Sequence, residues 1–243
     1  MKKNYENIDV RENSLAIVGY DDGGAGQISS WIENQNNYYV SCFVNPAESF
    51  VTVNIEAELK KREISRFNFP ANDMFKEKPL ISSVQWIDII KKIGIKKVLI
   101  TLAENDCRSY WIIKAKQAGL SMINCVHETA YITDALSLIG ENIIIYPKAY
   151  IGYYAEIHTG VIINTGAQVD HHNVIKFCGR LDPGVLMAGH VIVDECSTLH
   201  TGAVIKNKIK IGKSSVVGAG SVIIKDVPEN SLVVGVPGKV IKK

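Results

Sequence analysis

Residues 139–175 read IGENIIIYPKAYIGYYAEIHTGVIINTGAQVDHHNVI, and an aliphatic residue returns at every sixth position of this stretch. The same repeat continues without a break to Ile223. A period of six is neither the period of an amphipathic helix nor the simple alternation of a half-buried strand. The repeated positions are Ile139, Ile145, Ile151, Ile157, Ile163, Val169, Ile175, Leu181, Met187, Val193, Leu199, Ile205, Ile211, Val217 and Ile223.

The six-residue period fits a parallel β-helix, in which short strands joined by tight corners stack coil upon coil. Three hexads per coil place residues that are eighteen positions apart directly above one another. We therefore expect each repeated aliphatic residue to point into the coil. The position two before each of them is usually small or β-branched, as at Ala149 and Ala155. The period does not fix the handedness of the coil.

The N-terminal part lacks the repeat and alternates between strand and helix patterns. Strands are expected at 14–19, 39–44, 96–102 and 122–125. One helix is expected to end near Trp31, and two more are expected over 84–93 and 106–119. Such alternation is typical of a small doubly wound parallel sheet. A further helix is expected near 54–64 and an irregular excursion around Pro70. The sequence thus predicts an α/β, Rossmann-like domain over 1–135 and a parallel β-helix over 136–243.

The bulk composition argues against several classes of function. A net charge of +2 over 243 residues is not the charge of a nucleic-acid-binding chain. No apolar run approaches the length of a membrane span, and none resembles the apolar core of a signal peptide. The five cysteines form no CxxC pair, which indicates free thiols in a reducing compartment. We therefore expect a cytoplasmic protein without a nucleic-acid or membrane partner.

A glycine-rich turn, Gly19-Tyr-Asp-Asp-Gly-Gly-Ala-Gly26, follows the first expected strand. Such a turn before a helix exposes backbone N–H groups that suit a phosphate. The glycines miss the GxGxxG spacing, and no acidic residue ends the second strand, which argues against NAD. A nucleotide of another kind and a merely structural tight turn both remain open.

Residues 164–172 are the most polar part of the repeat, and His171 lies near the end of this segment. His171 follows the inward Val169 by two residues, so it is expected to face outward at a corner. Gly189 lies eighteen residues later, in the same column and one coil away, at the roughly 5 Å spacing of neighbouring strands. A base beside an exposed backbone N–H suits direct acyl transfer from a thioester, because the N–H stabilises the developing oxyanion. The alternative for a lone histidine is an ordinary surface residue.

The segment NTGAQVDHHNVI at 164–175, with PGV at 183–185 and AG at 188–189, resembles bacterial hexapeptide-repeat sugar acetyltransferases. The relevant types are the sialic acid O-acetyltransferases and the bacillosamine-pathway UDP-4-amino-sugar N-acetyltransferases. The resemblance also covers the glycine-rich turn and residues 105–108, 125–130 and 235–239. It implies a nucleotide-sugar-binding N-terminal domain and a left-handed β-helix. It further implies a homotrimer that binds acetyl-CoA between neighbouring subunits.

The same resemblance implies roles for individual residues. The catalytic histidine corresponds to His171, and the next position, commonly a carboxylate, is His172, which leaves Asp170 as a substitute partner. The coenzyme contacts correspond to Gly189, Arg180, Thr201 and Ala219. The sugar-nucleotide loop corresponds to Gly23, Gly24 and Ala25, with Asn45 where an acidic residue usually ends the second strand. The resemblance implies no metal.

We therefore expect an acetyl-CoA-dependent N-acetyltransferase that acts on the amino group of a nucleotide-linked amino sugar in surface glycan biosynthesis, with His171 as general base. An O-acetyltransferase acting on sialic acid or a related nonulosonic acid is the alternative. A β-helix carbonic anhydrase would need three convergent zinc ligands among His158, His171, His172, His190 and His200, although adjacent histidines usually point to opposite sides. A non-catalytic scaffold would bind no acetyl-CoA.

Overall fold

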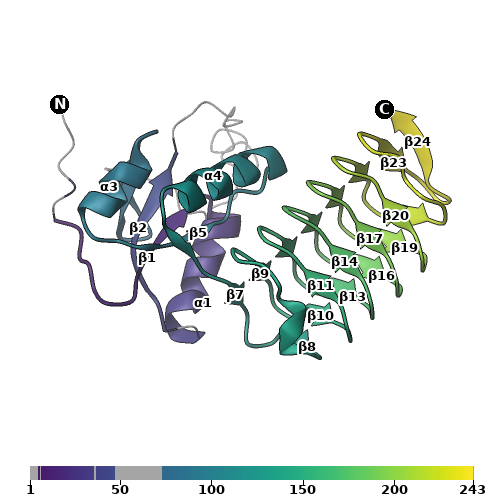
Figure 1. Cartoon of the computed structure of the whole chain (residues 1–243), viewed down its shortest axis with the longest axis horizontal. Coiled ribbons are helices and arrows are strands. Elements are labelled where there is room, and N and C mark those ends of the chain that lie inside the picture. Colours follow the sequence, from purple (N-terminus) through teal and green to yellow (C-terminus); the bar gives the residue numbers. More distant parts are fainter. Residues whose placement is uncertain (1–4, 6, 36, 47–72, 243) are drawn as a thin grey trace, which may run out of the picture. The chain divides into compact units, whose positions relative to one another are not determined.

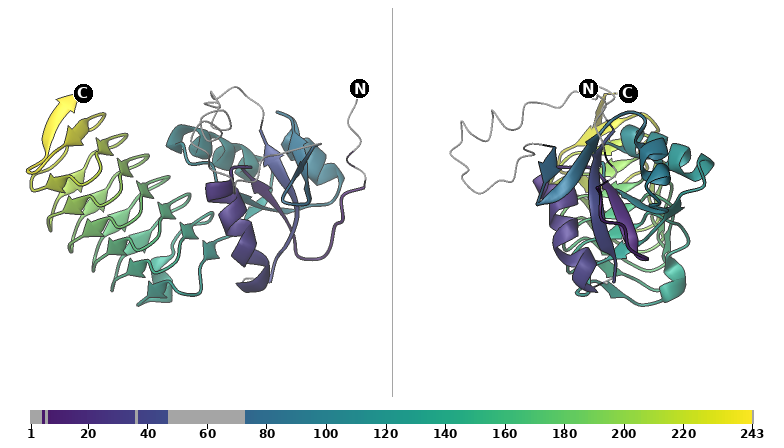
Figure 2. Two further views of the ribbon diagram at one scale, coloured as in Figure 1. Left: turned by 180° about the vertical axis from the view of Figure 1, so that it is seen from behind. Right: turned by 90° about the vertical axis from the view of Figure 1, so that its left-hand side faces the viewer.

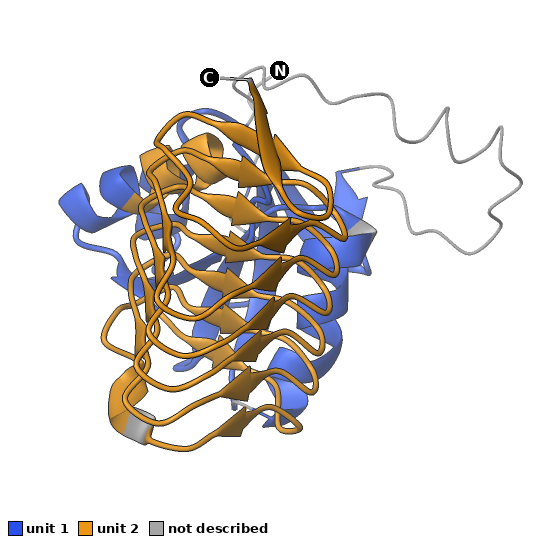
Figure 3. Ribbon diagram, turned by 90° about the vertical axis from the view of Figure 1, so that its right-hand side faces the viewer, with its two compact units in different colours: residues 1–103, 113–122 blue, residues 104–112, 123–243 orange. Residues whose placement is uncertain are grey.

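The computed structural model describes residues 5, 7–35, 37–46 and 73–242, and the chain forms two compact units (Figures 1 and 3). Unit 1 comprises residues 1–103 and 113–122, and unit 2 comprises residues 104–112 and 123–243. The helix expected near 54–64 and the excursion around Pro70 lie outside the described residues. The functional boundary between residues 135 and 136 stays a prediction.

Unit 1 is built on a sheet whose strand order is β3-β4-β2-β1-β5-β6. All neighbours pair in parallel except β3, which is antiparallel to β4. The central strand β1 is buried at every residue, as its sequence SLAIV predicts. The strands are β1 (Ser14–Val18), β2 (Tyr39–Asn45), β3 (Met74–Phe75), β4 (Lys78–Ser82), β5 (Lys97–Ile100) and β6 (Ser121–Met122). The α-helices among the described residues are α1 (Gln27–Gln35), α3 (Trp86–Lys92) and α4 (Asn105–Gln117).

The prediction of a single strand over 122–125 is wrong, because these residues are divided between two different sheets. Its first part is β6, which pairs with β5, and its last part is β7 (Cys125–Val126), which pairs with β9 (Ile144–Ile145) of unit 2. Asn124 stands at the break, donating to Gly140 O at 3.0 Å and accepting from Ile143 N at 2.9 Å. No helix in the described parts of the chain has the length and apolar character needed to cross a bilayer.

Unit 2 is a parallel β-helix whose strands stack rung upon rung in three sheets (Figure 2). Face 1 consists of β8 (Tyr131–Ile132), β10 (Tyr150–Ile151), β13 (Gln168–Val169), β16 (Leu186–Met187), β19 (Val204–Ile205) and β22 (Val222–Ile223). Face 2 consists of β11 (Glu156–Ile157), β14 (Val174–Ile175), β17 (Ile192–Val193) and β20 (Lys210–Ile211). Face 3 consists of β7, β9, β12 (Ile162–Ile163), β15 (Arg180–Leu181), β18 (Thr198–Leu199), β21 (Val216–Val217), β23 (Leu232–Val234) and the antiparallel β24 (Lys239–Lys242).

The six-residue repeat builds the interior of the coil as expected. Residues eighteen positions apart pair directly, as Ile151 does with Val169. From Ile145 to Ile223 each repeated aliphatic side chain is at most 3% exposed. The prediction that Ile139 points into the coil is wrong, since this residue is 55% exposed. Leu138 forms the bridge to Ile157 instead, and a slip of one residue moves a side chain to the opposite face of a strand.

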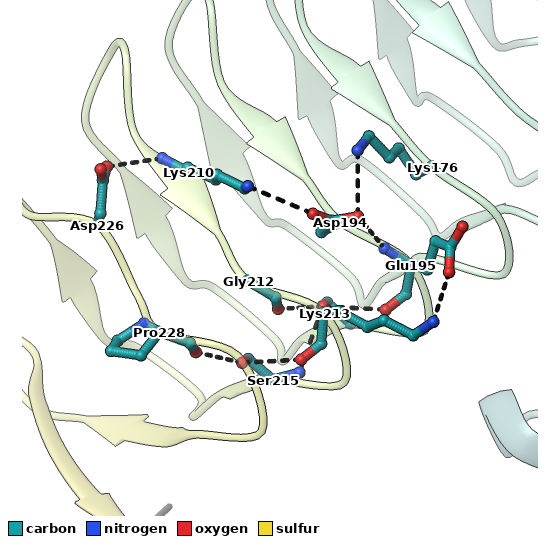
Figure 4. A network of polar contacts seen from close by, with 10 residues as sticks. Lys176, Asp194, Glu195, Lys210, Gly212, Lys213, Ser215, Asp226 and Pro228 are labelled. Atoms are coloured by element: carbon teal, nitrogen blue, oxygen red, sulfur yellow. Dashed lines mark hydrogen bonds and ion pairs between the residues drawn. The ribbon is translucent and has the colours of Figure 1, made fainter.

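Polar side chains stabilise the corner that joins face 2 to face 3 (Figure 4). The buried Ser197 donates to Gly212 O at 2.7 Å, and Ser215 repeats this contact with Pro228 O one coil later, at 2.6 Å. These bonds give the two buried hydroxyl groups an acceptor, and a buried polar group without a partner is destabilising. On the outside, Lys176 pairs with Asp194 at 3.2 Å, a partly exposed contact of small energetic weight.

The first turns of α4 attach to the same corner through a buried arginine. Arg108 donates to Gly160 O at 2.8 Å and to Cys178 O at 2.9 Å, while Asn105 donates to Cys196 O at 2.8 Å. The three carbonyl groups belong to successive coils. Residues 104–112 thereby bridge three rungs of unit 2, and burial lowers the pKa of Arg108.

Candidate active site

The imidazole ring of His171 lies directly over Gly189, at the corner that joins face 1 to face 2. A methyl group at residue 189 would lie 2.5 Å from His171 Nε2, so the ring occupies the space that a side chain there would need. His171 itself is exposed to solvent. The expected pairing of a histidine with a glycine one coil away is therefore present.

The backbone N–H of Gly189 has no hydrogen-bond acceptor among the residues that the structure describes. The two N–H groups beside it do, since Ala188 N donates to Ile205 O and His190 N donates to His171 O, each at 3.1 Å. Gly189 is buried, and a buried N–H without an acceptor is rare in folded proteins. The corner therefore presents a potential base next to an unused donor.

His172 turns its ring toward His171. Its φ of 57° is in the left-handed region, which redirects the side chain at the corner. The two Nδ1 atoms lie 3.0 Å apart, so one ring donates a hydrogen bond to the other. The expectation that adjacent histidines point to opposite sides is wrong at this corner. Asp170 instead accepts a hydrogen bond from the backbone N–H of His171, at 2.7 Å.

Three aromatic rings from successive coils lie along the same corner, and two of them are stacked. The rings of His172 and His190 lie 4.8 Å apart with an angle of 19° between them, and Tyr154 lies 5.5 Å from His172 on the other side. Desolvation and the neighbouring His172 and His171 lower the pKa of His190. The clustering of His190 with the other two histidines was not expected, although its spacing of eighteen from His172 was visible in the sequence.

A surface pocket on face 1 ends beside this corner. Asp170 and Ala188, which line it, immediately precede His171 and Gly189. Its other lining residues come from four neighbouring strands of the face: Tyr150, Gln168, Leu186, Met187, Val204 and Ile205. The pocket combines an apolar floor with one carboxylate at the end nearest the histidines.

Comparison with solved structures places this architecture among known proteins. PerB from Caulobacter crescentus, solved with CoA and GDP-perosamine, matches with a TM-score of 0.78 and 23% identity over 96% of this chain and 99% of its own. The acetyltransferase domain of PglB from Neisseria gonorrhoeae matches with a TM-score of 0.78 and 20% identity, over 95% and 100%. WeeI from Acinetobacter baumannii gives 0.72 and 21%, over 93% and 99%. No protein-family model matches the sequence.

The chain shares the fold of these proteins. The expected architecture, a Rossmann-like α/β domain followed by a left-handed parallel β-helix, is thereby confirmed. The likeness extends over nearly the full length of each compared chain. At 20–23% identity the likeness shows the shared fold alone, so the roles of the site residues are argued from their own geometry.

The four residues expected at the coenzyme lie at different parts of the coil. Gly189 stands under His171, whereas Arg180 is on β15 in face 3 and donates to Asp182 at 2.7 Å. Asp182 also contacts His200 at 2.7 Å, a contact that the sequence analysis missed. Thr201 and Ala219 occupy the same position in two successive coils, at the corner that joins face 3 to face 1. Among the described residues, neither of their N–H groups has an acceptor.

The glycine-rich turn of unit 1 forms a single wide helical turn before α1. Asp21 caps it, its carboxylate accepting from Gly24 N at 2.5 Å, so the N–H expected to hold a phosphate already has an anionic partner. Ala25 is fully buried. Asn45 ends β2, and its carbonyl accepts from Ser83 N at 3.1 Å. Asn45 and the turn stand at the carboxyl ends of adjacent parallel strands, where ligands of such sheets bind.

Lys76 is a cation at this turn that the sequence analysis missed. It comes from the hairpin of β3 and β4, and its Nζ donates to Gly26 O at 2.7 Å. The two residues are fifty positions apart and belong to no repeat, so no signal in the sequence indicated the contact. A lysine beside the glycine turn gives an anionic ligand a partner in addition to backbone N–H groups.

Proposed function

We propose that this protein is an acetyl-CoA-dependent N-acetyltransferase that acts on the amino group of a nucleotide-linked amino sugar. The observation on which the proposal rests is the position of His171 over Gly189, whose N–H has no acceptor among the described residues. The shared fold supports it, since PerB is described with CoA and GDP-perosamine bound.

His171 is proposed as the general base. Because its Nδ1 faces His172, its Nε2 is the ring nitrogen left to accept the proton of the attacking amine. The amine nitrogen forms a bond to the thioester carbon, and the carbon–sulfur bond breaks. The proton on Nε2 then passes to the departing thiolate. The Gly189 N–H is proposed to donate to the carbonyl oxygen as negative charge develops on it.

His172 is proposed to orient the base, in the place of the expected carboxylate. A hydrogen bond between the two Nδ1 atoms fixes the rotation and the tautomer of His171, as the third member of a catalytic triad does. Asp170 acts one step farther away, because its carboxylate bonds the backbone of His171 and not its ring. Cys178 is unsuited to act as a nucleophile, since burial raises its pKa to about 12.

The coenzyme is proposed to lie along face 1, between the two corners that border it. The pocket beside Asp170 and Ala188 would receive its acyl end. The unpaired N–H groups of Thr201 and Ala219 would bond its amide chain. Arg180, held by Asp182, is proposed to meet its phosphates across a subunit boundary. This arrangement requires a second copy of the chain over face 1, and we propose a homotrimer.

The nucleotide is proposed to bind at the glycine turn of unit 1, through Gly23, Gly24 and Asn45. Lys76 favours an anion there, whereas the carboxylate of Asp21 opposes it and must turn away from Gly24 N. The buried Ala25 shapes the turn from within. Free thiols at all five cysteines suit a cytoplasmic enzyme of surface glycan biosynthesis, which is the setting that we propose.

A substrate screen tests the proposal. The chain is incubated with acetyl-CoA and, separately, UDP-, dTDP- and GDP-linked amino sugars and free sialic acids, and products are identified by mass spectrometry. We expect acetylation of an amino sugar nucleotide and competitive inhibition by the matching nucleoside diphosphate. Acetylation of free nonulosonic acids alone, without inhibition by any nucleoside diphosphate, would establish the O-acetyltransferase alternative. Absence of acetyl-CoA binding in calorimetry would reject both.

The Asp21 carboxylate gives a second test, specific to the nucleotide site. Asp21→Asn removes a negative charge at the turn, so the KM for the sugar nucleotide should fall severalfold while that for acetyl-CoA stays unchanged. Asp88, on α3, serves as a matched control for the loss of a carboxylate in unit 1. An unchanged KM for the sugar nucleotide in Asp21→Asn would place the nucleotide elsewhere.

A further inference from the structure

His171, His172 and His190 form a cluster whose ring nitrogens suit metal binding. One nitrogen from each ring lies within 4.8 Å of the others, and all three residues are exposed. The ring of His171 meets the other two nearly edge-on, at centroid distances of 5.2 and 5.1 Å. All three side chains come from one chain, so the cluster does not depend on a second subunit.

The spacing of these nitrogens is close to that of a metal site. Zinc binds imidazole nitrogen at about 2.0–2.1 Å in tetrahedral geometry, which puts neighbouring ligand atoms about 3.4 Å apart. His171 Nδ1 and His172 Nδ1 are already 3.0 Å apart. The three side chains are exposed, so their side-chain torsions are free to bring the third nitrogen closer.

We propose that this three-histidine cluster binds one divalent transition-metal ion, such as Zn²⁺, and that the bound ion stops acetyl transfer. Imidazole is a preferred ligand of zinc, copper and nickel, and a poor one for magnesium. Three protein ligands leave a fourth position for water. The ion is thus an inhibitor at the proposed base and not a cofactor of the reaction.

Inhibition follows from competition for His171, and this half of the inference rests on the proposed function. An ion bound at His171 Nε2 occupies the lone pair of the base, and an ion bound at Nδ1 leaves the ring proton on Nε2, so in either case His171 cannot accept a proton from the amine. An ion held at His172 removes the Nδ1–Nδ1 hydrogen bond that orients the base, so binding through either pair of rings has the same consequence. His190 contributes only to the metal site, because it has no part in the proposed transfer.

Metal binding is measured first, on the full chain without an affinity tag. Calorimetry with Zn²⁺, and the visible absorption of added Co²⁺, should show one ion per chain, and Mg²⁺ should give no signal. His190→Asn should weaken binding by roughly tenfold or more, since even residues behind a metal ligand change affinity by 10- to 100-fold. His127→Asn, outside the cluster, should bind as the wild type does. Equal affinity in wild type and His190→Asn would overturn the proposed site.

Turnover is measured next, after treatment with EDTA. The metal-free chain should be fully active, Zn²⁺ should inhibit it, and His190→Asn should keep its turnover while needing a higher Zn²⁺ concentration for inhibition. Activity that is lost with EDTA and restored by Zn²⁺ would overturn the inhibitory role, as would tight Zn²⁺ binding without inhibition. If the metal-free chain transfers no acetyl group, the proposed function fails, while the binding measurement still decides whether the metal site exists.

Discussion

The ring of His171 fills the space that a side chain at Gly189 would occupy. A methyl group there would lie 2.5 Å from Nε2, although the two residues are eighteen positions apart and pair only because successive coils stack. The absence of a side chain at residue 189 therefore sets the position of the proposed base. Its N–H stays beside the ring in the same arrangement.

Gly189→Ala should lower turnover by roughly tenfold to a hundredfold, because the methyl group displaces the ring while the N–H remains. The measurement is steady-state kinetics, combined with a thermal melt to verify folding. The matched control is Gly189→Ala in a His171→Ala background, where no ring remains to be displaced and little further loss is expected. An equal loss in both backgrounds would mean that the glycine acts in another way.

Substitutions at the three polar residues of the corner should rank in a fixed order. His171→Ala should lower turnover by roughly 10²- to 10⁴-fold with little change in the KM for acetyl-CoA, as loss of a general base does. His172→Ala should lower it less, because its ring orients the base. Asp170→Asn should have the smallest effect, since its carboxylate contacts backbone. A larger loss for His172→Ala than for His171→Ala would reverse the assignment of the base.

Cys178 should remain unreactive in the folded chain. Burial raises its pKa to about 12, so at pH 8 only about one thiol in 10⁴ is ionised. Iodoacetamide labelling followed by peptide mapping should modify Cys196 before Cys178, since Cys196 is only partly buried. Cys178→Ala should retain full turnover, and an acetylated Cys178 peptide isolated during turnover would contradict direct transfer.

Arg108→Met should destabilise the protein by roughly 3 kcal/mol, because it leaves the carbonyl groups of Gly160 and Cys178 buried without their donor. Arg11→Met is the control, since the Arg11 side chain is 61% exposed and solvent screens its ion pair with Asp9, so a much smaller loss is expected. Urea denaturation measures both. Similar losses in the two variants would show that the buried contacts contribute little to stability.

Leu186→Asp should convert the proposed trimer into monomers, because it places a charge in the middle of the apolar face 1. Ile192→Asp on face 2 is a matched control, as the two side chains are 40% and 37% exposed. Analytical ultracentrifugation at micromolar concentration distinguishes the outcomes. A wild-type monomer, or a trimer that survives Leu186→Asp, would exclude face 1 as the interface.

The sequence by itself determined the β-helix, because a triangular coil needs an aliphatic side chain inward at every sixth residue. The same spacing predicted that Gly189 stacks on His171, and the principal strands of unit 1 followed from their continuous apolar runs. These features depend on local pattern and on a regular repeat, which are both visible along the chain.

Only the tertiary structure decided how the polar side chains are directed. His172 Nδ1 lies 3.0 Å from His171 Nδ1, and the carboxylate of Asp21 accepts a hydrogen bond from Gly24 N. Lys76 reaches the glycine turn from a hairpin fifty residues away. The repeat sets the backbone angles of the turns, since a positive φ recurs every six residues from Asn142 to Gly220. The rotamer of a side chain at a corner, and the distant segment that packs beside a turn, leave no periodic trace in the sequence.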